Sequence, residues 1–540
     1  MKSFKKAFFY SLLSLLSGIL LWASWPERGM PALIFIALTP LLWLEERFLE
    51  KKSSGKRKIM FLYYYLGMLT WNFLTTWWIW NSSAVGSIVA IGLNSFFMAV
   101  IWQLYFSTRK RYGTAVGYIS LIVYWISFEF LHMNWEISWP WLTLGNVFAD
   151  MTEWVQWYEY TGVLGGSIWV LALNLLIFQL FKNLIKRDLI IRLRQMNSLI
   201  LASVTVILLF APVFVSKQLL TRRGDTGIPM EVCIVQPNVD PYNEKFKGTG
   251  SEQLAGMLRL SSTVVDSGTS LLVFPETALP DGIWLEELYI HRDILQIKSW
   301  LNAYPKLNLL TGFTAFRHYP KGSELSHTAR KFRDSEDHFD VYNSALMIRK
   351  TDSIQVYHKS RLVPGVEKMP YPAIFGFLED YAIELGGTSG SLGMQNDRRN
   401  FITQDHVKIA PAICYESVYG GFMSAYIRKG AEFLVIVTND GWWGNTAGYK
   451  QHMHYARLRA IEFRKSIARS ANTGISCFIN QKGEIVSRTK WWEEDAIKGT
   501  VYRNNNITFY ARYGNYLGFI AAFVSICMLT FMLIKKMIHK

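Results

Sequence analysis

The chain has few cysteines and few charged residues for its length. Only 18% of its 540 residues are charged, and it contains four cysteines: Cys233, Cys414, Cys477 and Cys527. Four scattered cysteines are too few for a disulfide scaffold, and no Cys-x-x-Cys pair or Cys/His spacing typical of zinc ligands occurs. His452 and His454 are two residues apart, a spacing that does not align ligands on one face of a helix. We therefore expect no metal and no other cofactor.

Positive charge is in excess but is confined to short segments. The net charge is +16. All of this excess falls in five segments that together hold 20 Lys/Arg and 4 Asp/Glu: residues 1–6, 45–58, 107–113, 182–195 and 535–540. The rest of the chain is neutral in sum, so the charge does not call for nucleic acid as a partner. Each basic segment adjoins an apolar run, as cytoplasmic loops of membrane proteins do.

Long apolar runs and 15% aromatic residues, including 21 Trp, indicate a membrane protein. A crossing helix needs about 20 mostly apolar residues. Eight spans are predicted near residues 7–25, 30–44, 59–80, 83–106, 114–133, 163–181, 198–215 and 516–534. The second is short and contains Pro31 and Pro40. The first resembles a signal peptide, but "LWASWPERG" is a poor cleavage site, so we interpret it as a span.

Charge asymmetry sets the predicted orientation. The loops opposite the basic segments, near 81–82 and 134–162, contain no Lys or Arg, so both termini are expected in the cytoplasm. The large remaining stretch then lies outside the cytoplasm, which in a bacterium is the periplasm. Three parts are predicted: about seven transmembrane helices in 1–215, a periplasmic domain in 216–512, and a final transmembrane helix with a basic tail in 513–540.

The predicted domain has the pattern of an α/β fold. Eight short apolar runs are predicted strands: "EVCIVQP", "SLLVFPE", "NLLTGFTAF", "YNSALMIR", "SIQVYHK", "VKIAPAIC", "EFLVIVTND" and "GISCFIN". Helical patterns lie between several of them, at 251–266, 284–302, 416–429 and 449–466. The segment 364–396 is a long irregular connection, and a loop of that length in a compact domain is usually functional.

Three polar residues stand at the ends of predicted strands: Glu276, Lys359 and Cys414. Strand ends are where α/β sheets assemble their sites. A following helix and a nearby lysine would favour a thiolate, the lysine could bind an oxyanion, and a buried glutamate could take the thiol proton. Each residue also has a structural explanation: a buried thiol, a helix cap and a solvated lysine. Spacing alone does not bring the three together.

Four motifs occur in order along the chain: "FPET", "YHKSRLVPGVE", "APAICYES" and "TNDGWWG". Together they resemble the Glu–Lys–Cys motifs of the nitrilase superfamily of carbon–nitrogen hydrolases, whose domain is an α-β-β-α sandwich. With the membrane spans, the whole chain resembles the lipoprotein N-acyltransferases of that superfamily. The resemblance implies transfer of a fatty acyl chain from a phospholipid, through a cysteine thioester, to the α-amino group of diacylglyceryl-modified apolipoproteins at the bacterial inner membrane. A monomer is expected.

The resemblance also implies roles for single residues. Glu276 would be the general base, Lys359 the stabiliser of the tetrahedral oxyanion, and Cys414 the nucleophile. Three further residues match supporting positions of the family: Glu367, Tyr415 and Glu416. Charge complementarity in the first turn of a helix would also explain Glu416. Trp442, Trp443 and His452 are interpreted as scaffold.

Two features depart from the family pattern. This chain reads "PGVE", from Pro364 to Glu367, where the family has Pro-Phe-Gly-Glu, and Phe246 is the nearest aromatic residue to a missing tryptophan. Both departures concern the shape of the acyl pocket. The apolar stretch from Tyr371 to Phe377 is either a lid or membrane-dipping loop, or ordinary packing.

Two other functions stay open from the sequence. A membrane-tethered amidase or nitrilase-like hydrolase would use the same residues with water as the acceptor. A transporter or receptor with a degenerate domain is disfavoured because charged residues are rare in the spans, Glu129 being an exception.

Overall fold

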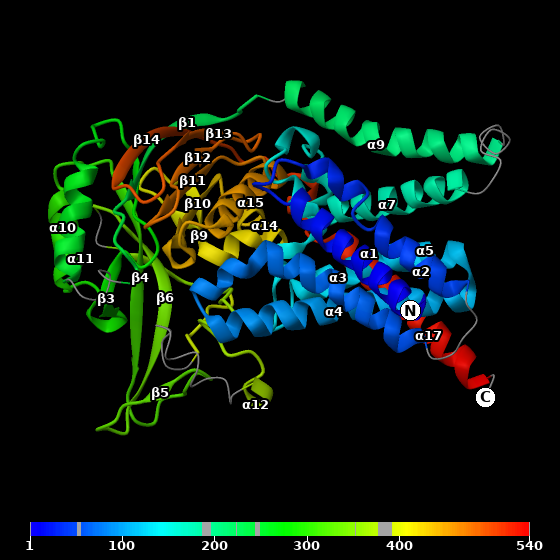
Figure 1. Cartoon of the computed structure of the whole chain (residues 1–540). Helices are drawn as coiled ribbons and strands as arrows, with labels where there is room; N and C mark the ends of the chain where they lie inside the picture. The colour runs from blue at the N-terminus through cyan, green and yellow to red at the C-terminus, as the bar shows by residue number, and fades with distance from the viewer. Residues whose placement is uncertain are drawn as a thin grey trace. The chain divides into compact units, whose positions relative to one another are not determined.

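The computed structural model describes residues 2–50, 56–185, 196–222, 224–242, 249–350, 353–375 and 391–538. The chain divides into two compact units (Figure 1). The first comprises Met1–Trp77, Ser87–Arg222 and Asn515–Lys540, and the second comprises Trp78–Gly86 and Arg223–Gly514. These borders lie a few residues from the predicted ones, and the short segment Trp78–Gly86 is an addition that the sequence did not suggest.

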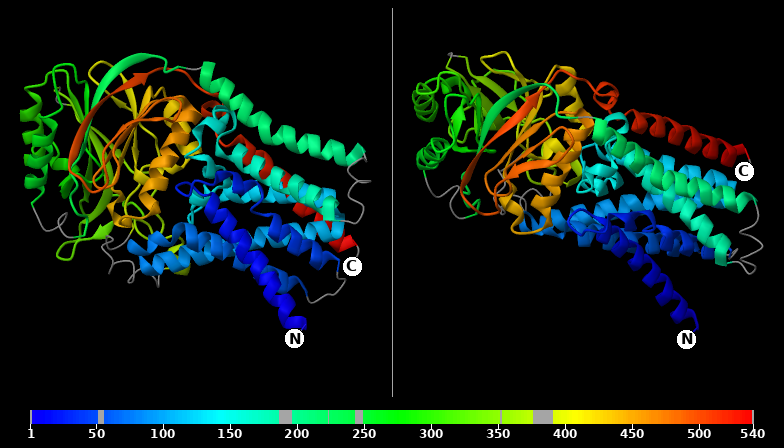
Figure 2. Two further views of the ribbon diagram at one scale, coloured as in Figure 1. Left: turned by 45° about the horizontal axis from the view of Figure 1, so that its top comes forward. Right: turned by 90° about the horizontal axis from the view of Figure 1, so that it is seen from above.

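The first unit is helical. Its longer elements are α1 (Lys2–Ser24), α2 (Thr39–Leu49), α3 (Lys56–Thr76), α4 (Ala84–Tyr112), α5 (Thr114–His132), α7 (Val163–Ile185), α9 (Met196–Arg222) and α17 (Tyr516–Ile538). Its short elements are η1 (Pro31–Phe35), η3 (Pro140–Leu142), η4 (Leu144–Phe148), η5 (Thr152–Trp154) and α6 (Tyr158–Thr161). Figure 2 shows the long helices running alongside one another, and α1 packs on α3, α5 on α17 and α7 on α9.

Within the described residues, six helices are long and apolar enough to cross a membrane: α1, α4, α5, α7, α9 and α17. All six coincide with predicted spans. The predicted span at 30–44 is not one helix, because it is divided between η1 and α2, each of which has a proline in its first turn. The span predicted at 59–80 is helical as α3, but its tyrosines and Asn72 leave it outside the six. The exact number of crossings remains a prediction.

The second unit contains two β-sheets. The first has the order β14-β1-β2-β4-β6-β5, with β3 beside β4 and β7 beside β6. Its strands are β1 (Ile228–Gln236), β2 (Leu271–Val273), β3 (Leu279–Trp284), β4 (Asn308–Tyr319), β5 (Arg330–Lys331), β6 (His338–Ile348), β7 (Gln355–His358) and β14 (Asp495–Arg503). The second has the order β13-β12-β11-β10-β9-β8. Its strands are β8 (Phe401–Ile402), β9 (Lys408–Ile413), β10 (Phe433–Thr438), β11 (Ile467–Ala471), β12 (Cys477–Ile479) and β13 (Ile485–Arg488).

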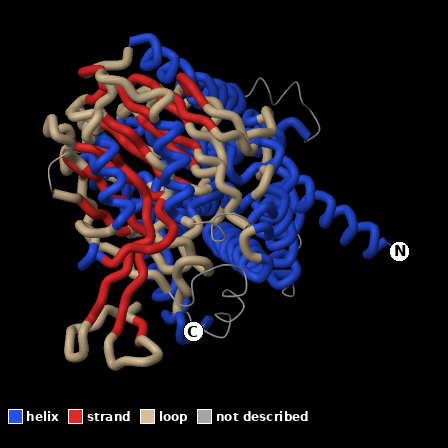
Figure 3. The backbone as a smooth tube through the Cα atoms, turned by 90° about the vertical axis from the view of Figure 1, so that its left-hand side faces the viewer, coloured by secondary structure: helices blue, strands red, loops and turns tan. Residues whose placement is uncertain are grey.

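Helices cover the outer faces of the two sheets (Figures 1 and 3). α10 (Gly250–Ser261) and α11 (Arg292–Leu301) lie against the first sheet, and α14 (Gly420–Arg428) and α15 (Ala447–Phe463) lie against the second. The remaining short elements are η2 (Trp77–Asn81), η6 (Leu285–Glu287), η8 (Cys414–Val418), η9 (Asp440–Trp443), α12 (Pro372–Phe375) and α16 (Phe509–Tyr513). The layer order is α-β-β-α, as predicted.

The core of this unit follows from the apolar runs. Cys233 of β1, Leu309 of β4 and Leu346 of β6 pack with Leu254 of α10 and Ile294 of α11 in one buried cluster. All eight predicted strands are confirmed. The helix predicted at 284–302 is wrong at its start, because α11 begins only at Arg292, after the end of β3 and η6.

The segment Trp78–Gly86 lies between α3 and α4 in the sequence but packs on η9. The Asn81 side-chain amide donates to the Trp443 carbonyl at 2.9 Å, and the Ser82 hydroxyl donates to the Trp442 carbonyl at 3.2 Å. The rings of Trp78 and Trp443 are 4.8 Å apart. The second unit is therefore built from two separate pieces of sequence.

Candidate active site

Glu276, Lys359 and Cys414 lie at the carboxyl ends of strands. Glu276 follows β2, Lys359 directly follows β7, and Cys414 directly follows β9. β9 runs parallel to β10, so the residue after β10, Asn439, emerges at the same edge as Cys414. The parallel ladders thus bring side chains from distant parts of the sequence to one edge.

Two carboxylates and one amide surround the Lys359 ammonium. Lys359 Nζ is 3.2 Å from Glu276 Oε1 and 2.8 Å from Glu367 Oε1. Asn343 Nδ2, from β6, donates to the same two oxygens at 2.7 and 2.9 Å. The backbone N–H of Asn439 donates to Glu276 Oε2 at 3.0 Å. Glu276 therefore accepts three hydrogen bonds, as an ionised carboxylate does.

The lysine is charged in this setting. It is almost fully buried, with 1% of its surface exposed. Burial alone would lower the pKa of the Lys359 ammonium, but the carboxylates of Glu276 and Glu367 outweigh it and raise that pKa above its ordinary value. A permanent ammonium at this place can bind a developing oxyanion.

Cys414 has an unusual backbone conformation. Its φ is 50°, in the left-handed region that residues other than glycine rarely adopt. The chain turns there from β9 into η8, and α14 follows only from Gly420, so the predicted helix at 416–429 begins as a 3₁₀ turn. A sharp, strained turn after a strand presents a nucleophile at the sheet edge.

The sequence predicts that the following helix and Lys359 favour a thiolate at Cys414, but other groups at the site oppose them. Burial and the neighbouring Glu276 carboxylate raise the pKa of the Cys414 thiol, and Lys359 and a hydrogen bond with Thr438 only partly oppose them. The resting site therefore holds a neutral thiol beside a carboxylate and an ammonium. Such a thiol needs a base to remove its proton as it attacks, and the Glu276 carboxylate, whose charge raises the pKa of this thiol, is the candidate base.

Glu416 connects the lysine and cysteine segments. Its Oε1 accepts from the Tyr357 hydroxyl and from Ser360 N, each at 2.6 Å, and its Oε2 accepts from Ile413 N at 2.9 Å. Burial raises the pKa of the Glu416 carboxyl to about 7, although these hydrogen bonds oppose the shift. The hydrogen bond from Ile413 N is the one expected of a residue in the first turn of a helix. The hydrogen bonds from Tyr357 and Ser360 join a different segment of the chain, so helix capping does not explain them. Tyr415 is buried beside Tyr419, with ring centroids 5.1 Å apart.

The "PGVE" departure leaves Glu367 at the site. Gly365 has a φ of 80°, so it supplies the left-handed turn that the segment needs. Glu367 Oε2 accepts from Val363 N at 2.8 Å, while Oε1 meets Lys359. The neighbouring aromatic stretch is described only up to Phe375, as α12, and Phe246 also lies outside the described residues, so the lid and pocket predictions are not tested.

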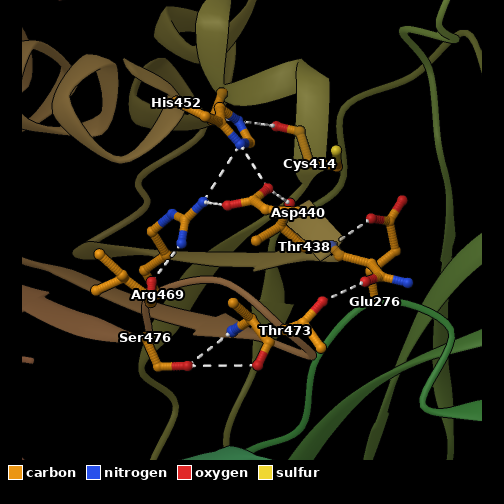
Figure 4. Close-up of polar contacts among 12 residues, drawn as sticks. Glu276, Cys414, Thr438, Asp440, His452, Arg469, Thr473 and Ser476 are labelled. Atoms are coloured by element: carbon orange, nitrogen blue, oxygen red, sulfur yellow. Dashed lines mark hydrogen bonds and ion pairs between the residues drawn. The ribbon is translucent and has the colours of Figure 1, made fainter. Parts of the chain in front are cut away.

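A second polar cluster lies behind Cys414, and sequence reasoning had interpreted its one flagged member, His452, as scaffold (Figure 4). His452 Nε2 is 3.2 Å from the Cys414 carbonyl oxygen, and its Nδ1 is 3.0 Å from Asp440 Oδ1. Asp440 also forms an ion pair with Arg469 and accepts from Thr438 Oγ1 at 2.8 Å. Asn343 was missed as well. For Asn343, Thr438 and Asp440 the available signal was a polar residue inside or at the end of an apolar strand, whereas His452 on α15 and Arg469 in β11 carried no such signal.

No metal centre is found in the part of the chain that the structure describes, where no group of three or more His, Cys, Asp or Glu residues could hold an ion. The groups described above that can take part in acid–base chemistry are the side chains of Glu276, Lys359 and Cys414.

Comparisons with known proteins identify the family of the chain. The family model of the carbon–nitrogen hydrolases matches residues 232–506, and that of the apolipoprotein N-acyltransferase N-terminal domain matches residues 17–176. An apolipoprotein N-acyltransferase of Chlorobaculum tepidum is 31% identical over 92% of this chain and 92% of its own length. The chain belongs to the apolipoprotein N-acyltransferase family.

Two further members of the apolipoprotein N-acyltransferase family show lower identity to this chain. Those of Geobacter metallireducens and Thermotoga maritima are 27% and 24% identical, over 93% and 95% of this chain and 91% and 92% of their own. Among solved structures, Saccharomyces cerevisiae Nit3, of branch 10 of the nitrilase superfamily, is 14% identical and covers 52% of this chain and 91% of that chain, with a TM-score of 0.35. The fold assignment rests on the family models and the two sheets. The chain is thus a multi-pass membrane acyltransferase with a nitrilase-like domain.

Proposed function

We propose that this chain transfers a fatty acyl group from a phospholipid to the α-amino group of the N-terminal diacylglyceryl-cysteine of apolipoproteins. The observation that carries the proposal is a cysteine in a strained turn at the same sheet edge as a buried lysine that is paired with two carboxylates. A thiol nucleophile, a carboxylate base and a cation that stabilises an oxyanion are the groups that covalent acyl transfer requires. Membership of the acyltransferase family supports an amine, rather than water, as the second acceptor.

The first half-reaction would load the enzyme. Glu276 takes the thiol proton as Cys414 Sγ attacks the ester carbonyl carbon, forming a C–S bond and an oxyanion that Lys359 stabilises. The oxyanion then collapses and the C–O bond breaks. The leaving lysophospholipid oxygen receives the proton from Glu276, and the acyl group stays on Cys414 as a thioester.

The second half-reaction would unload it. The α-amine of the lipoprotein attacks the thioester carbonyl, a C–N bond forms, and the C–S bond breaks after Glu276 has accepted a proton from the amine. That proton returns to the Cys414 sulfur. One acceptor replaces another at a single covalent intermediate, so the kinetics are expected to be ping-pong.

The membrane helices fit this chemistry. Both substrates are anchored in a bilayer by their acyl chains, so a catalytic domain tethered to the same membrane meets them at high local concentration. We further propose that the domain lies on the periplasmic side of a bacterial inner membrane, with both termini in the cytoplasm.

Intact mass spectrometry of the full chain incubated with phospholipid tests the proposal. The wild-type protein is expected to gain the mass of one acyl group, and Cys414→Ala to gain none. A diacylglyceryl-cysteine peptide should then discharge the adduct and appear as the amide. Cys477→Ala is the matched control, because Cys477 is also buried but lies in β12.

Two results would contradict the proposal. An adduct that water discharges as fast as the peptide does would instead identify a membrane-tethered hydrolase. Folded wild-type protein that forms no adduct with any phospholipid would exclude the lipid donor.

A further inference from the structure

The carbonyl group of the nucleophile is held by two side chains. Ser417 Oγ donates to the Cys414 oxygen at 2.7 Å, and His452 Nε2 lies 3.2 Å from the same atom. A carbonyl oxygen can only accept, so this contact places a proton on Nε2 of the imidazole. His452 is buried on α15, with 1% of its surface exposed.

His452 is in turn held from its other side. Its Nδ1 is 3.0 Å from Asp440 Oδ1 and 3.2 Å from Arg469 Nη2, and Asp440 and Arg469 form a buried ion pair. The Arg469 and His452 charges outweigh burial and hold the pKa of Asp440 at about 2, so its carboxylate stays ionised. Figure 4 shows Asp440, His452 and Arg469 each in contact with the other two.

Asp440 reaches Cys414 by two routes. The Thr438 hydroxyl donates to Asp440 Oδ1 at 2.8 Å, and Thr438 also lowers the pKa of the Cys414 thiol. The second route runs through His452 to the Cys414 carbonyl oxygen. One carboxylate is thereby connected to the backbone of the cysteine and to a neighbour of its thiol.

The carbonyl contact has a geometric consequence. In a planar trans peptide the C=O and N–H bonds point in opposite directions. Holding the Cys414 oxygen against His452 therefore directs the N–H of Tyr415 away from His452. The same anchor also holds the left-handed conformation of Cys414, which persists only where the surroundings enforce it.

We propose that His452, supported by Asp440 and Arg469, is a positioning residue that fixes the Cys414–Tyr415 peptide plane for acyl transfer. This inference rests on the proposed function, since it concerns the same nucleophile. The positioning role of His452 differs from a purely structural role in its effect on rate. If the cluster were only structural, its loss would lower the stability of the protein. If His452 positions the peptide, its loss also slows the attack of Cys414 in protein that is still folded.

Two amide substitutions separate these roles. In His452→Gln the side-chain nitrogen can occupy the place of Nε2, and in His452→Asn only that of Nδ1. The Gln variant is expected to form the acyl adduct within about tenfold of the wild-type rate, and the Asn variant about 100-fold more slowly, as a misplaced reacting group does. The apparent KM for phospholipid should stay within about twofold in both, because neither change touches the substrate.

The matched control is His454→Asn. His454 lies on the same helix, and its Nδ1 is 3.1 Å from Arg457 Nη1 rather than near Cys414. Its adduct rate is expected to equal that of the wild-type protein. Unfolding midpoints of all variants are measured in the same detergent. If His452→Asn does not fold, Asp440→Asn replaces it, with the same expected loss of rate.

A lipid-free measurement separates this inference from the proposed function. With Cys233, Cys477 and Cys527 replaced by alanine, the remaining cysteine can carry a ¹³C-labelled carbonyl for infrared spectroscopy. Loss of the imidazole donor should raise the labelled carbonyl frequency in His452→Asn but not in His452→Gln. Absence of any adduct in the wild-type protein would defeat the proposed function alone. An unmoved band, or equal adduct rates in folded Gln and Asn variants, would overturn the positioning role.

Discussion

At the scale of single residues, the site depends on buried side chains that each satisfy several backbone and side-chain partners. Glu416 is the clearest case, because one carboxylate fastens both the Lys359 segment and the Cys414 segment through Ser360 N and Ile413 N. The motifs identified Glu416 as a neighbour of the cysteine. Its function as a connector depends on contacts with Tyr357 and Ser360, more than fifty positions earlier.

Glu416 should make stability depend on pH. Its carboxyl pKa is raised from 4.5 to about 7 in the folded protein, so the folded state binds more protons than the unfolded state between these values. Stability from this group is therefore fully present below about pH 4.5 and is lost as pH rises to about 7, by up to about 3 kcal/mol. Glu416→Gln should flatten this dependence while lowering stability overall, as measured by thermal unfolding from pH 5 to 8.

Glu287→Gln is the control for that measurement, because Glu287 is exposed on η6. It should leave the pH dependence unchanged. An unaltered slope in Glu416→Gln would mean that other groups cause the pH dependence.

Sequence reasoning reached part of the site for an identifiable reason. Glu276, Lys359 and Cys414 stand beside apolar runs, so each was visible as a polar residue at a strand end. Asn343 was not, although it donates to both Glu276 and Glu367. It lies inside β6, and only the pairing of β6 with β4 and β7 sets where it points.

At the scale of elements, strands with strong apolar patterns were predictable and strands made by pairing were not. β11 reads "IARSA", and its burial comes from lying between β10 and β12. β14 is long but mixed in polarity, and it forms by pairing with β1 across most of the domain sequence. Neither strand has an apolar pattern of its own that predicts it, because each forms through pairing with its neighbouring strands.

Gly312 sets how closely β4 approaches the segment that carries Glu276. A Cβ at this position would lie 2.5 Å from Thr277 N and 2.6 Å from Glu276 Cα. Both atoms belong to the backbone, so Gly312→Ala must displace the Glu276 segment. We expect a loss of about 1–3 kcal/mol in stability and a fall of about 100-fold in adduct formation, measured by intact mass spectrometry.

Gly256→Ala provides the opposite case. Gly256 lies within α10, and no atom is within 4 Å of its would-be Cβ. This change should raise stability by up to about 1 kcal/mol and leave the adduct rate unchanged.

Full activity in Gly312→Ala would show that the position of Glu276 is less critical than the contacts imply.

At the scale of the whole molecule, the charge pattern and the fold agree on one point of topology. The loop near 81–82, which lacks Lys and Arg, packs on Trp442 and Trp443 of the nitrilase-like domain. We therefore expect loop and domain to lie on one side of the membrane, which is also what the positive-inside pattern predicts. Which side that is remains a prediction.

Cysteine labelling tests the side. In a background where Cys527 is serine, Ser323→Cys in the exposed part of the domain should react with a membrane-impermeant maleimide in intact spheroplasts. Glu50→Cys, in a basic segment, should react only after the membrane is broken. The reverse pattern would place the domain in the cytoplasm.

The packing of Trp78–Gly86 against Trp442 and Trp443 also governs the order of biogenesis. This segment leaves the ribosome before the whole of Ser87–Arg222 and must wait for its partners until translation has passed Trp443. The coding sequence of the second unit is therefore split in two, and a fragment that encodes only residues 223–514 lacks the Trp78–Gly86 part of that unit. Exchanging catalytic domains between relatives therefore requires moving both pieces together.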